Sequence, residues 1–342
     1  MTFQQSSQPV SQESLKFSAN NKVLAPLDQK LGVLEEQLYQ FLFSNLNGDS
    51  NVNKYFLVPV GLPGMGKTTL SRFLSATSQN YINERINRQL TQPANLKNKR
   101  AGLPKPIKIE FLKISYDRIL TSNQQEYCDA HPGVGMHEAI DIIRPKADQD
   151  YLDAITFQCH DSLDSENPGK AGEFLVKRII YLDRNNTPDV WPDIQKTIEA
   201  ANYTAKTRSY KSVIIVPEQH PDFNPSLYHT QNPICPQMMF ECIKRIFGRP
   251  SHDCLSSACK PKVVEVILKF AKLYDGADFQ SDDRLKQHFD DFVRLDFLQF
   301  GERSNLAPET VETLIEGYNQ TPPNFQCPSD ETIARVIRAC EH

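Results

Sequence analysis

Four short apolar runs divide the first two thirds of the chain. Residues 55–60 are almost entirely apolar and end at a glycine, and the other runs cover 108–115, 177–182 and 212–217. All four are rich in Val, Ile, Tyr and Phe, residues that favour strands. Apolar runs of this length are typical of strands buried in a parallel sheet. We predict four strands at these positions.

Segments with helical spacing of apolar residues separate the predicted strands. They cover residues 68–78, 136–143, 151–161 and 192–201. Strands that alternate with helices are joined by crossover connections, which make neighbouring strands parallel. The pattern predicts an α/β fold with a parallel sheet.

Further helices are predicted on both sides of this region. One lies within 23–46, two more cover 238–247 and 263–273, and the last sixty residues carry an amphipathic set that includes Leu285, Phe289, Phe292, Val293 and Leu295. We divide the chain into a disordered tail at 1–21, a main domain at 22–281 and a helical extension at 282–342. Residues 79–106 are polar and resemble an insertion.

Composition limits the classes of protein to which the chain can belong. It has 342 residues, 38 Lys and Arg against 42 Asp and Glu, and a net charge of −4. No run approaches the roughly 20 apolar residues of a spanning helix, so we expect no membrane. The acidic total argues against binding nucleic acid by bulk charge, although a local basic site is compatible with it.

The N-terminus and the cysteines point to a reducing compartment. Residues 1–21 lack an apolar core and an Arg-rich amphipathic pattern, so they resemble neither a signal nor a transit peptide. The eight cysteines form no Cys-x-x-Cys pair, and Cys254 and Cys259 beside His252 fit no common zinc module. We expect reduced thiols and a cytoplasmic or nuclear location.

The segment after the first predicted strand carries the clearest chemistry. Residues 61–68 read Gly-Leu-Pro-Gly-Met-Gly-Lys-Thr and match the phosphate-loop pattern in full, between a strand and a helix. The backbone amides and Lys67 would face the phosphates of ATP or GTP, and the Thr68 hydroxyl would bind Mg²⁺. The predicted nucleotide contacts are Gly61, Gly64, Met65, Gly66, Lys67, Thr68 and Thr69.

The second predicted strand ends in Ser-Tyr-Asp-Arg at 115–118. Ligands of open parallel sheets bind at the carboxyl ends of strands, so Asp117 is a candidate base for an acceptor hydroxyl. We expect its strand to lie next to the strand that precedes the glycine loop. Asp is equally suited to a helix N-cap, and the residues alone do not choose between the two.

Polar residues also follow the third strand, and arginines follow the fourth. Asp183, Arg184, Asn185 and Asn186 could contact substrate, hold Mg²⁺ through water or form an Asx turn. Arg245 and Arg249 are four residues apart and could close over a triphosphate, or form a solvated helix face.

Four elements therefore follow one another: Gly-Leu-Pro-Gly-Met-Gly-Lys-Thr-Thr at 61–69, Ile-Ser-Tyr-Asp-Arg at 114–118, Leu-Asp-Arg-Asn-Asn at 182–186, and Lys-Arg-Ile-Phe-Gly-Arg-Pro-Ser-His-Asp-Cys-Leu at 244–255. Their order resembles that of the polynucleotide 5′-kinase branch of P-loop phosphotransferases, most of all the kinase domain of fungal-type tRNA ligases. The resemblance spans about residues 55–277. It implies a P-loop NTPase-type parallel sheet flanked by helices, with helical N- and C-terminal extensions.

The resemblance also implies an activity, which is transfer of the γ-phosphate of ATP or GTP, with Mg²⁺, to the 5′-OH end of RNA, for which a tRNA fragment is one candidate. In that family the residue at the position of Asp117 is the general base. Asp183, Arg184, Asn185 and Asn186 would shape the acceptor side with Arg118, and Arg245 and Arg249 would be lid arginines.

The sequence differs from the family pattern at two motifs and lacks two of the modules found in complete tRNA ligases. Leu120 stands where bacteriophage-type polynucleotide kinases have an arginine, and the lid segment at 251–253 reads Ser-His-Asp instead of Asn-His-Gln. The motifs of the ligase and cyclic phosphodiesterase modules are missing. We therefore expect a kinase that works alone or beside separate ligase and phosphodiesterase proteins.

Basic residues cluster before and around Asp117, namely Lys97, Lys99, Arg100, Lys105, Lys108, Lys113 and Arg118. They could contact an RNA backbone or form a solvated loop. Two other functions remain open: a P-loop kinase that acts on aminoacyl-tRNA or a small metabolite, and an NTP-binding regulatory protein without kinase activity.

Overall fold

A five-stranded, all-parallel sheet forms the centre of the protein. The computed structural model describes residues 52–76, 84, 87–88, 107–160, 175–204, 210–218, 233–248, 255, 258–296, 306–322 and 327–341. The strand order is β2-β3-β1-β4-β5, and the strands are β1 (Lys54–Pro59), β2 (Ile107–Ser115), β3 (Leu175–Asp183), β4 (Tyr210–Pro217) and β5 (Asp291–Leu295). The predicted α/β class with a parallel sheet is confirmed.

Strand β1 lies in the middle of the sheet. It pairs with β3 on one side and β4 on the other, and all six of its residues are buried. Successive residues of a strand point to opposite faces, so both faces of the sheet are covered at β1. The segment that follows β1 therefore starts from the centre of the sheet.

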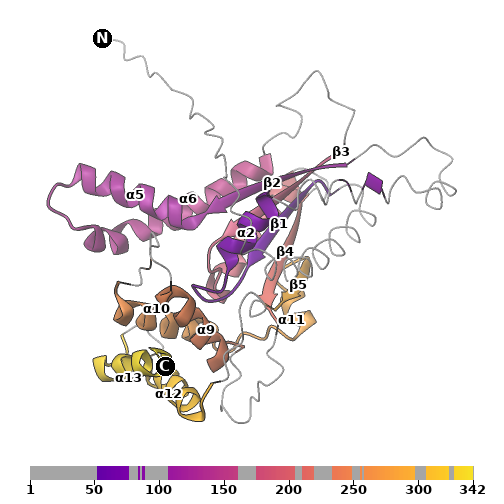
Figure 1. Ribbon diagram of the computed structural model, residues 1–342. Helices are drawn as coiled ribbons and strands as arrows, with labels where there is room; N and C mark the ends of the chain where they lie inside the picture. The colour runs from indigo at the N-terminus through magenta and orange to yellow at the C-terminus, as the bar shows by residue number, and fades with distance from the viewer. Residues whose placement is uncertain are drawn as a thin grey trace, which may run out of the picture.

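Helices flank the sheet, and two groups of them stand apart from it (Figure 1). A long pair, α5 and α6, extends from one side, while α9, α10, α12 and α13 gather in a separate cluster. The helices are α2 (Lys67–Ala76), α5 (Tyr116–Ala130), α6 (Met136–His160), α7 (Trp191–Thr204), α9 (Pro236–Phe247), α10 (Lys260–Leu273), α11 (Asp282–Lys286), α12 (Pro308–Gln320) and α13 (Asp330–Glu341), with a 3₁₀ turn at Pro188–Val190.

Helix α5 was not predicted from the sequence, because its apolar stripe is short and polar residues interrupt it. Only Tyr116 and Asn123 of this helix are buried. Ile119, Leu120 and Tyr127 are partly buried against the core. Polar contacts with α6 add to this packing: the Asn123 side-chain amide donates to Asp150 at 2.7 Å, and Lys146 donates to the Asn123 side-chain oxygen at 2.7 Å. The buried position 123 is polar, so the apolar periodicity of this helix is broken in its middle and gives only a weak signal.

Helix α6 runs without a break where two helices were predicted. Pro145 lies inside it, and proline removes one backbone hydrogen bond from a helix interior. Buried residues at four-residue spacing continue through this point: Ala139, Ile143, Ala147, Tyr151, Ile155 and Cys159. The burial of this stripe outweighs the proline. At the helix end, Lys54 donates to the Gln158 and Cys159 carbonyl oxygens at 2.5 and 3.0 Å.

The predicted helical character of 282–342 requires a correction. Phe292, Val293 and Leu295 were placed in an amphipathic helical set, yet they form strand β5 and pair with β4, with Phe292 opposite Ile214. The segment forms a strand because its β-branched and aromatic residues favour one and because the edge of β4 offers backbone hydrogen-bond partners. Helices α12 and α13 confirm the rest of the extension and pack on α9 and α10.

Several predictions lie outside the described residues. These are the tail at 1–21, the helix within 23–46, most of the insertion at 79–106, and Arg249 with the segment at 251–254. The boundary between the main domain and the C-terminal extension also stays a prediction. Within the described part of the chain, no helix combines the length and the apolar character needed to cross a membrane.

Candidate functional site

The glycine loop connects β1 to α2 at the carboxyl edge of the sheet. Gly61, Gly64 and Gly66 all have positive φ angles, of 130°, 83° and 99°. At Gly64 a Cβ atom would lie 2.8 Å from the Cys242 carbonyl oxygen and 3.1 Å from the Ile246 side chain, both in α9. The loop therefore follows a path that only glycine permits, pressed closely against α9.

A Gly64→Ala variant should therefore lose stability. The left-handed backbone and the close carbonyl of α9 together are expected to cost about 1–3 kcal/mol of unfolding free energy. Gly135→Ala is the control, because a Cβ there meets nothing within 4 Å and its φ angle is unexceptional. Urea unfolding measures both variants, and equal stability of the two would contradict the close packing of the loop on α9.

Lys67 begins α2 and turns back over the loop. Its side chain is only 7% exposed, and its ammonium group donates to the Gly61 and Leu62 carbonyl oxygens at 2.8 and 2.7 Å. The first amides of a helix have no intrahelical acceptor, and here they follow directly on a glycine-rich turn. This arrangement places a buried positive charge and a helix N-terminus at the same point, which suits an anion such as a phosphate.

Thr68 and Asp183 bring two oxygen ligands together. The Thr68 hydroxyl lies 3.5 Å from the Asp183 Oδ2 atom, across the gap between α2 and the end of β3. The same oxygen forms an ion pair with the Lys113 ammonium group of β2 at 2.5 Å. Hydroxyl and carboxylate oxygens are ligands that Mg²⁺ accepts, usually together with water and phosphate oxygens. The pair therefore fits the predicted metal, with Asp183 as a partner of Thr68.

This pair is a partial ligand set. Among the described residues, no group of three or more His, Cys, Asp and Glu side chains is placed to hold a metal ion by itself. A divalent ion at Thr68 would depend on further oxygens, such as those of a bound nucleotide.

Two buried tyrosines hold the glycine loop in place. The Tyr181 hydroxyl donates to the Lys67 carbonyl oxygen at 2.7 Å, and the Tyr274 hydroxyl accepts from the Gly61 amide at 2.9 Å. Tyr274 also donates to the Asn185 carbonyl oxygen at 2.6 Å. Burial raises the pKa of both phenols, so they remain protonated. Sequence reasoning missed both, because an isolated tyrosine in a strand, like Tyr181, or directly after a helix, like Tyr274, carries no local signal.

Asp117 lies in the first turn of α5, directly after β2, and is exposed. The N-cap residue of α5 is Ser115. The alternative prediction, that Asp117 is the N-cap, is therefore wrong. A negative charge is nevertheless favourable in the first turn of a helix. The carboxyl edge of the sheet carries Asp117 and the glycine loop together, as predicted.

The expected position of the Asp117 strand requires a correction. Strand β3 separates β2 from β1, so β2 is not the direct neighbour of the strand before the glycine loop. Since strands are about 4.8 Å apart, the ends of β2 and β1 lie roughly 10 Å from each other. On this side of the sheet the direct neighbour of β1 is β3, which ends in Asp183.

Arg184 is engaged by α5 and α6. Its guanidinium lies 4.0 Å from the centre of the Tyr116 ring and 5.5 Å from that of Tyr151, and it pairs with Asp148 at 2.8 Å. The Tyr116 hydroxyl donates to the same carboxylate at 2.8 Å; burial and this carboxylate raise the pKa of Tyr116 to about 12. Arg184 therefore anchors the start of α5, next to Asp117. The sequence-based expectation for Arg184 is a substrate contact, and in the structure its partners are protein side chains.

Asn186 is a structural residue where a substrate contact was predicted. It is fully buried with a φ angle of 46°, and its amide donates to the Pro59, Leu182 and Arg184 carbonyl oxygens at 2.8, 3.0 and 3.2 Å. These bonds tie the end of β1 to the end of β3. Its neighbour Asn185 is half-buried, and its carbonyl oxygen accepts from Tyr274.

Arg245 reaches the glycine loop from α9. Its guanidinium donates to the Met65 carbonyl oxygen at 3.4 Å. Met65 is itself fully buried, and its sulfur accepts from the Leu62 amide at 3.2 Å, so this side chain fills the inside of the loop.

Two other predicted contact residues, Thr69 and Arg118, are exposed. Of the basic residues near Asp117, Lys108 pairs with Glu110 at 3.0 Å and Lys113 with Asp183.

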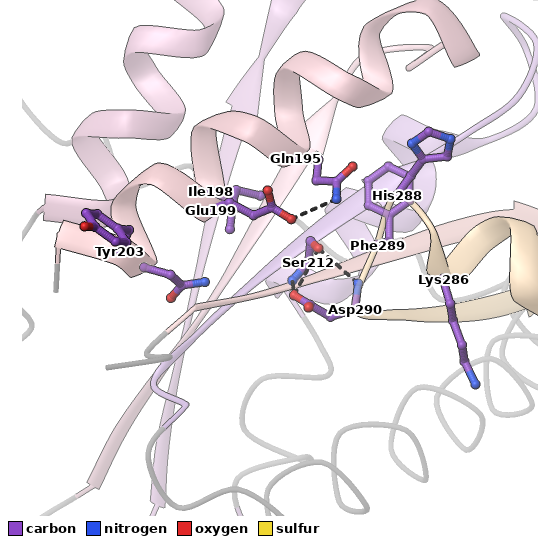
Figure 2. A pocket seen from close by; sticks show the side chains of 10 residues that line it. Gln195, Ile198, Glu199, Tyr203, Ser212, Lys286, His288, Phe289 and Asp290 are labelled. Carbon is purple, nitrogen blue, oxygen red and sulfur yellow. Dashed lines mark hydrogen bonds between the residues drawn. The ribbon is translucent and has the colours of Figure 1, made fainter. Parts of the chain in front are cut away.

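A separate hollow of about 840 Å³ lies between α7 and the segment from α11 to β5 (Figure 2). Figure 2 shows Ser212 and Asp290 facing each other, and the Ser212 amide donates to the Asp290 carboxylate at 2.8 Å. Gln195 and Glu199 likewise bond to each other at 2.8 Å. The hollow is near the amino ends of β4 and β5, away from the glycine loop, and these four polar side chains are bonded within it or to neighbouring backbone.

Comparison of the chain with protein-family models, with curated proteins and with solved structures gives no match. The interpretation of the site therefore depends on its own geometry.

Proposed function

We propose that the chain transfers the γ-phosphate of ATP or GTP, with Mg²⁺, to the 5′-OH end of RNA. The observation that supports this most is the arrangement at the carboxyl edge of the sheet. Lys67, Thr68 and Asp183 surround the end of the glycine loop, and Asp117 follows β2 on the same edge. The residues around the glycine loop suit a nucleotide, and Asp117 suits the hydroxyl of an acceptor.

On the nucleotide side, residues 61–68 serve as a phosphate loop. The loop amides and the start of α2 would bind the phosphates, and Lys67 would exchange its two carbonyl partners for phosphate oxygens. Thr68 and Asp183 would hold Mg²⁺, which when bound neutralises charge on the phosphates. Arg245, already in contact with the loop at Met65, would offset charge on the leaving group.

On the acceptor side, Asp117 acts as the general base. As the acceptor oxygen forms its bond to the γ-phosphorus, its proton passes to the Asp117 carboxylate and the bond to the nucleoside diphosphate breaks. Two strand spacings separate the ends of β1 and β2, which leaves room for the γ-phosphate and the hydroxyl between them. Arg184 keeps α5 in position by binding Tyr116 and Asp148.

The assignment of RNA as acceptor depends on the resemblance to tRNA ligase-type kinases. Arg118, exposed beside Asp117, is the described basic residue best placed to meet a phosphate of the acceptor strand. In this proposal separate ligase and phosphodiesterase proteins would handle the other steps of RNA repair.

A small acceptor is a second candidate, and one observation favours it. Residues 116–160, which form α5 and α6 next to the acceptor side, contain eight acidic residues and three basic ones. An acidic surface repels a phosphodiester backbone, so a long RNA would not lie along this helix pair. A small metabolite, or an aminoacyl-tRNA that presents only its end, avoids this repulsion.

Phosphate transfer from each NTP in turn decides between these functions. The full chain is incubated with γ-labelled ATP or GTP, Mg²⁺ and a panel of acceptors: 5′-OH oligoribonucleotide, 5′-OH oligodeoxynucleotide, nucleosides and small hydroxylated metabolites. Label on the oligoribonucleotide is the expected result. Label on a small acceptor alone would favour the second candidate, and NTP binding without any labelled acceptor would identify a regulatory NTP-binding protein.

A further inference from the structure

One oxygen of Asp183 is shared between a lysine and the hydroxyl of Thr68. The Lys113 ammonium group lies 2.5 Å from Oδ2, and Thr68 Oγ1 lies 3.5 Å from the same atom. Ser115 of β2 is paired in register with Asp183 of β3, so Lys113, two residues earlier, projects from the same face of the sheet. The side chains of Lys113 and Asp183 are only 29% and 11% exposed.

This ion pair differs from the other one that a lysine of β2 makes. Lys108 pairs with Glu110 at 3.0 Å, but its side chain is 53% exposed, and Glu110 also binds the buried Arg178 at 3.0 Å. That pair is toward the amino end of β2. Lys113 instead reaches the carboxyl edge, where the residues proposed to bind metal are.

A metal ion at Thr68 would compete with Lys113 for Asp183. A carboxylate already neutralised by an ammonium group at 2.5 Å attracts a divalent cation much less than a bare one. The buried Lys67 adds another positive charge at the start of α2. A nucleotide changes this balance, because its phosphates supply negative charge that a flexible lysine side chain can follow.

We propose that Lys113 is a positioning residue that makes metal binding at Asp183 depend on the nucleotide. Its ammonium group neutralises Asp183 until the phosphates of an NTP arrive, and then moves to them and leaves the carboxylate to the metal. The inference rests on the proposed function, since it assumes that the glycine loop binds an NTP.

Binding of Mn²⁺ in place of Mg²⁺, followed by electron paramagnetic resonance, tests this inference on the full chain without nucleotide. Lys113→Met should bind Mn²⁺ at least about tenfold more tightly than the wild type, because the competing charge is gone. Lys113→Arg keeps the charge and should match the wild type. Lys108→Met is the matched control and should also match it. The gain should disappear in Lys113→Met combined with Asp183→Asn.

Three results would overturn the inference. They are equal Mn²⁺ affinity of Lys113→Met and the wild type, an equal gain in Lys113→Arg, and a gain that persists without the Asp183 carboxylate. Thermal unfolding checks that each variant is folded. If Lys113→Met does not fold, Lys113→Gln, which also removes the charge, takes its place with the same expected gain in Mn²⁺ affinity.

A second arm repeats the titrations with ATP or GTP present. The difference between Lys113→Met and the wild type should then shrink to within about threefold, because the phosphates take the ammonium group from Asp183. If the tenfold difference in Mn²⁺ affinity persists with bound nucleotide, Lys113 does not move from Asp183 to the phosphates, and that part of the inference is overturned. If the chain binds no nucleotide at all, the proposed function fails, and the titration without nucleotide still decides whether Lys113 controls Asp183.

Discussion

Replacing Asp117 by alanine is expected to leave nucleotide binding intact and to slow phosphate transfer by about 10²–10⁴-fold, the range that a positioned general base contributes. Asp117 follows β2, whereas Lys67 and Thr68 follow β1, and strand β3 lies between them. A residue at that position can meet the acceptor hydroxyl without being part of the nucleotide site. The measurement is single-turnover transfer from labelled NTP, with nucleotide affinity determined separately by calorimetry.

Asp129→Ala is the control for the Asp117 variant. Asp129 is in the last turn of the same helix, is exposed and accepts a hydrogen bond from Gln125 at 2.7 Å. Its loss should change neither rate nor affinity. Because Asp117 also carries a favourable charge in the first turn of α5, its loss should lower stability by about 0.3–1 kcal/mol, which thermal unfolding detects. A wild-type transfer rate in Asp117→Ala would show that another group is the base.

The sheet and the glycine loop were predictable because their signals are local. Strands β1 and β4 are continuous buried runs, and the spacing of glycines before Lys67 reports a backbone path that other residues cannot follow. Strand β5 was missed because its five residues fit an amphipathic helix equally well. Pairing with β4, far away in sequence, is what makes it a strand.

The roles of the residues after β3 depended on contacts that the sequence does not contain. Asp183 to Asn186 look alike as four polar residues after an apolar run. In the structure Asp183 faces Thr68, Arg184 stacks on Tyr116 in α5, and Asn186 is buried between β1 and β3. The partners are up to 127 residues away in the sequence. A polar cluster at a strand end thus indicates where a candidate site lies. The role of each residue in the cluster becomes clear only from its tertiary contacts.

Lys67→Met is expected to reduce both nucleotide affinity and transfer. A hydrogen bond from a charged group contributes about 1.5–3 kcal/mol, so affinity should fall roughly 10- to 100-fold. Loss of one donor to transition-state charge typically costs about 10²–10³ in kcat. Methionine retains most of the side-chain volume at a position that is only 7% exposed, so the core around the loop stays filled. Calorimetric titration with ATP and GTP and single-turnover transfer measure the two effects.

Lys54→Met provides a matched control for this variant, because Lys54 is a second buried lysine bonded to two backbone carbonyl oxygens. It is 2% exposed and lies at the amino end of β1, where it donates to Gln158 and Cys159 of α6. Both substitutions leave two carbonyl groups without their lysine, and each should lower unfolding free energy by about 1–3 kcal/mol. Only Lys67→Met should lose nucleotide affinity per folded molecule. An equal loss in Lys54→Met would mean that the effect comes from weakened folding, and an unchanged affinity in Lys67→Met would remove the glycine loop from the nucleotide site.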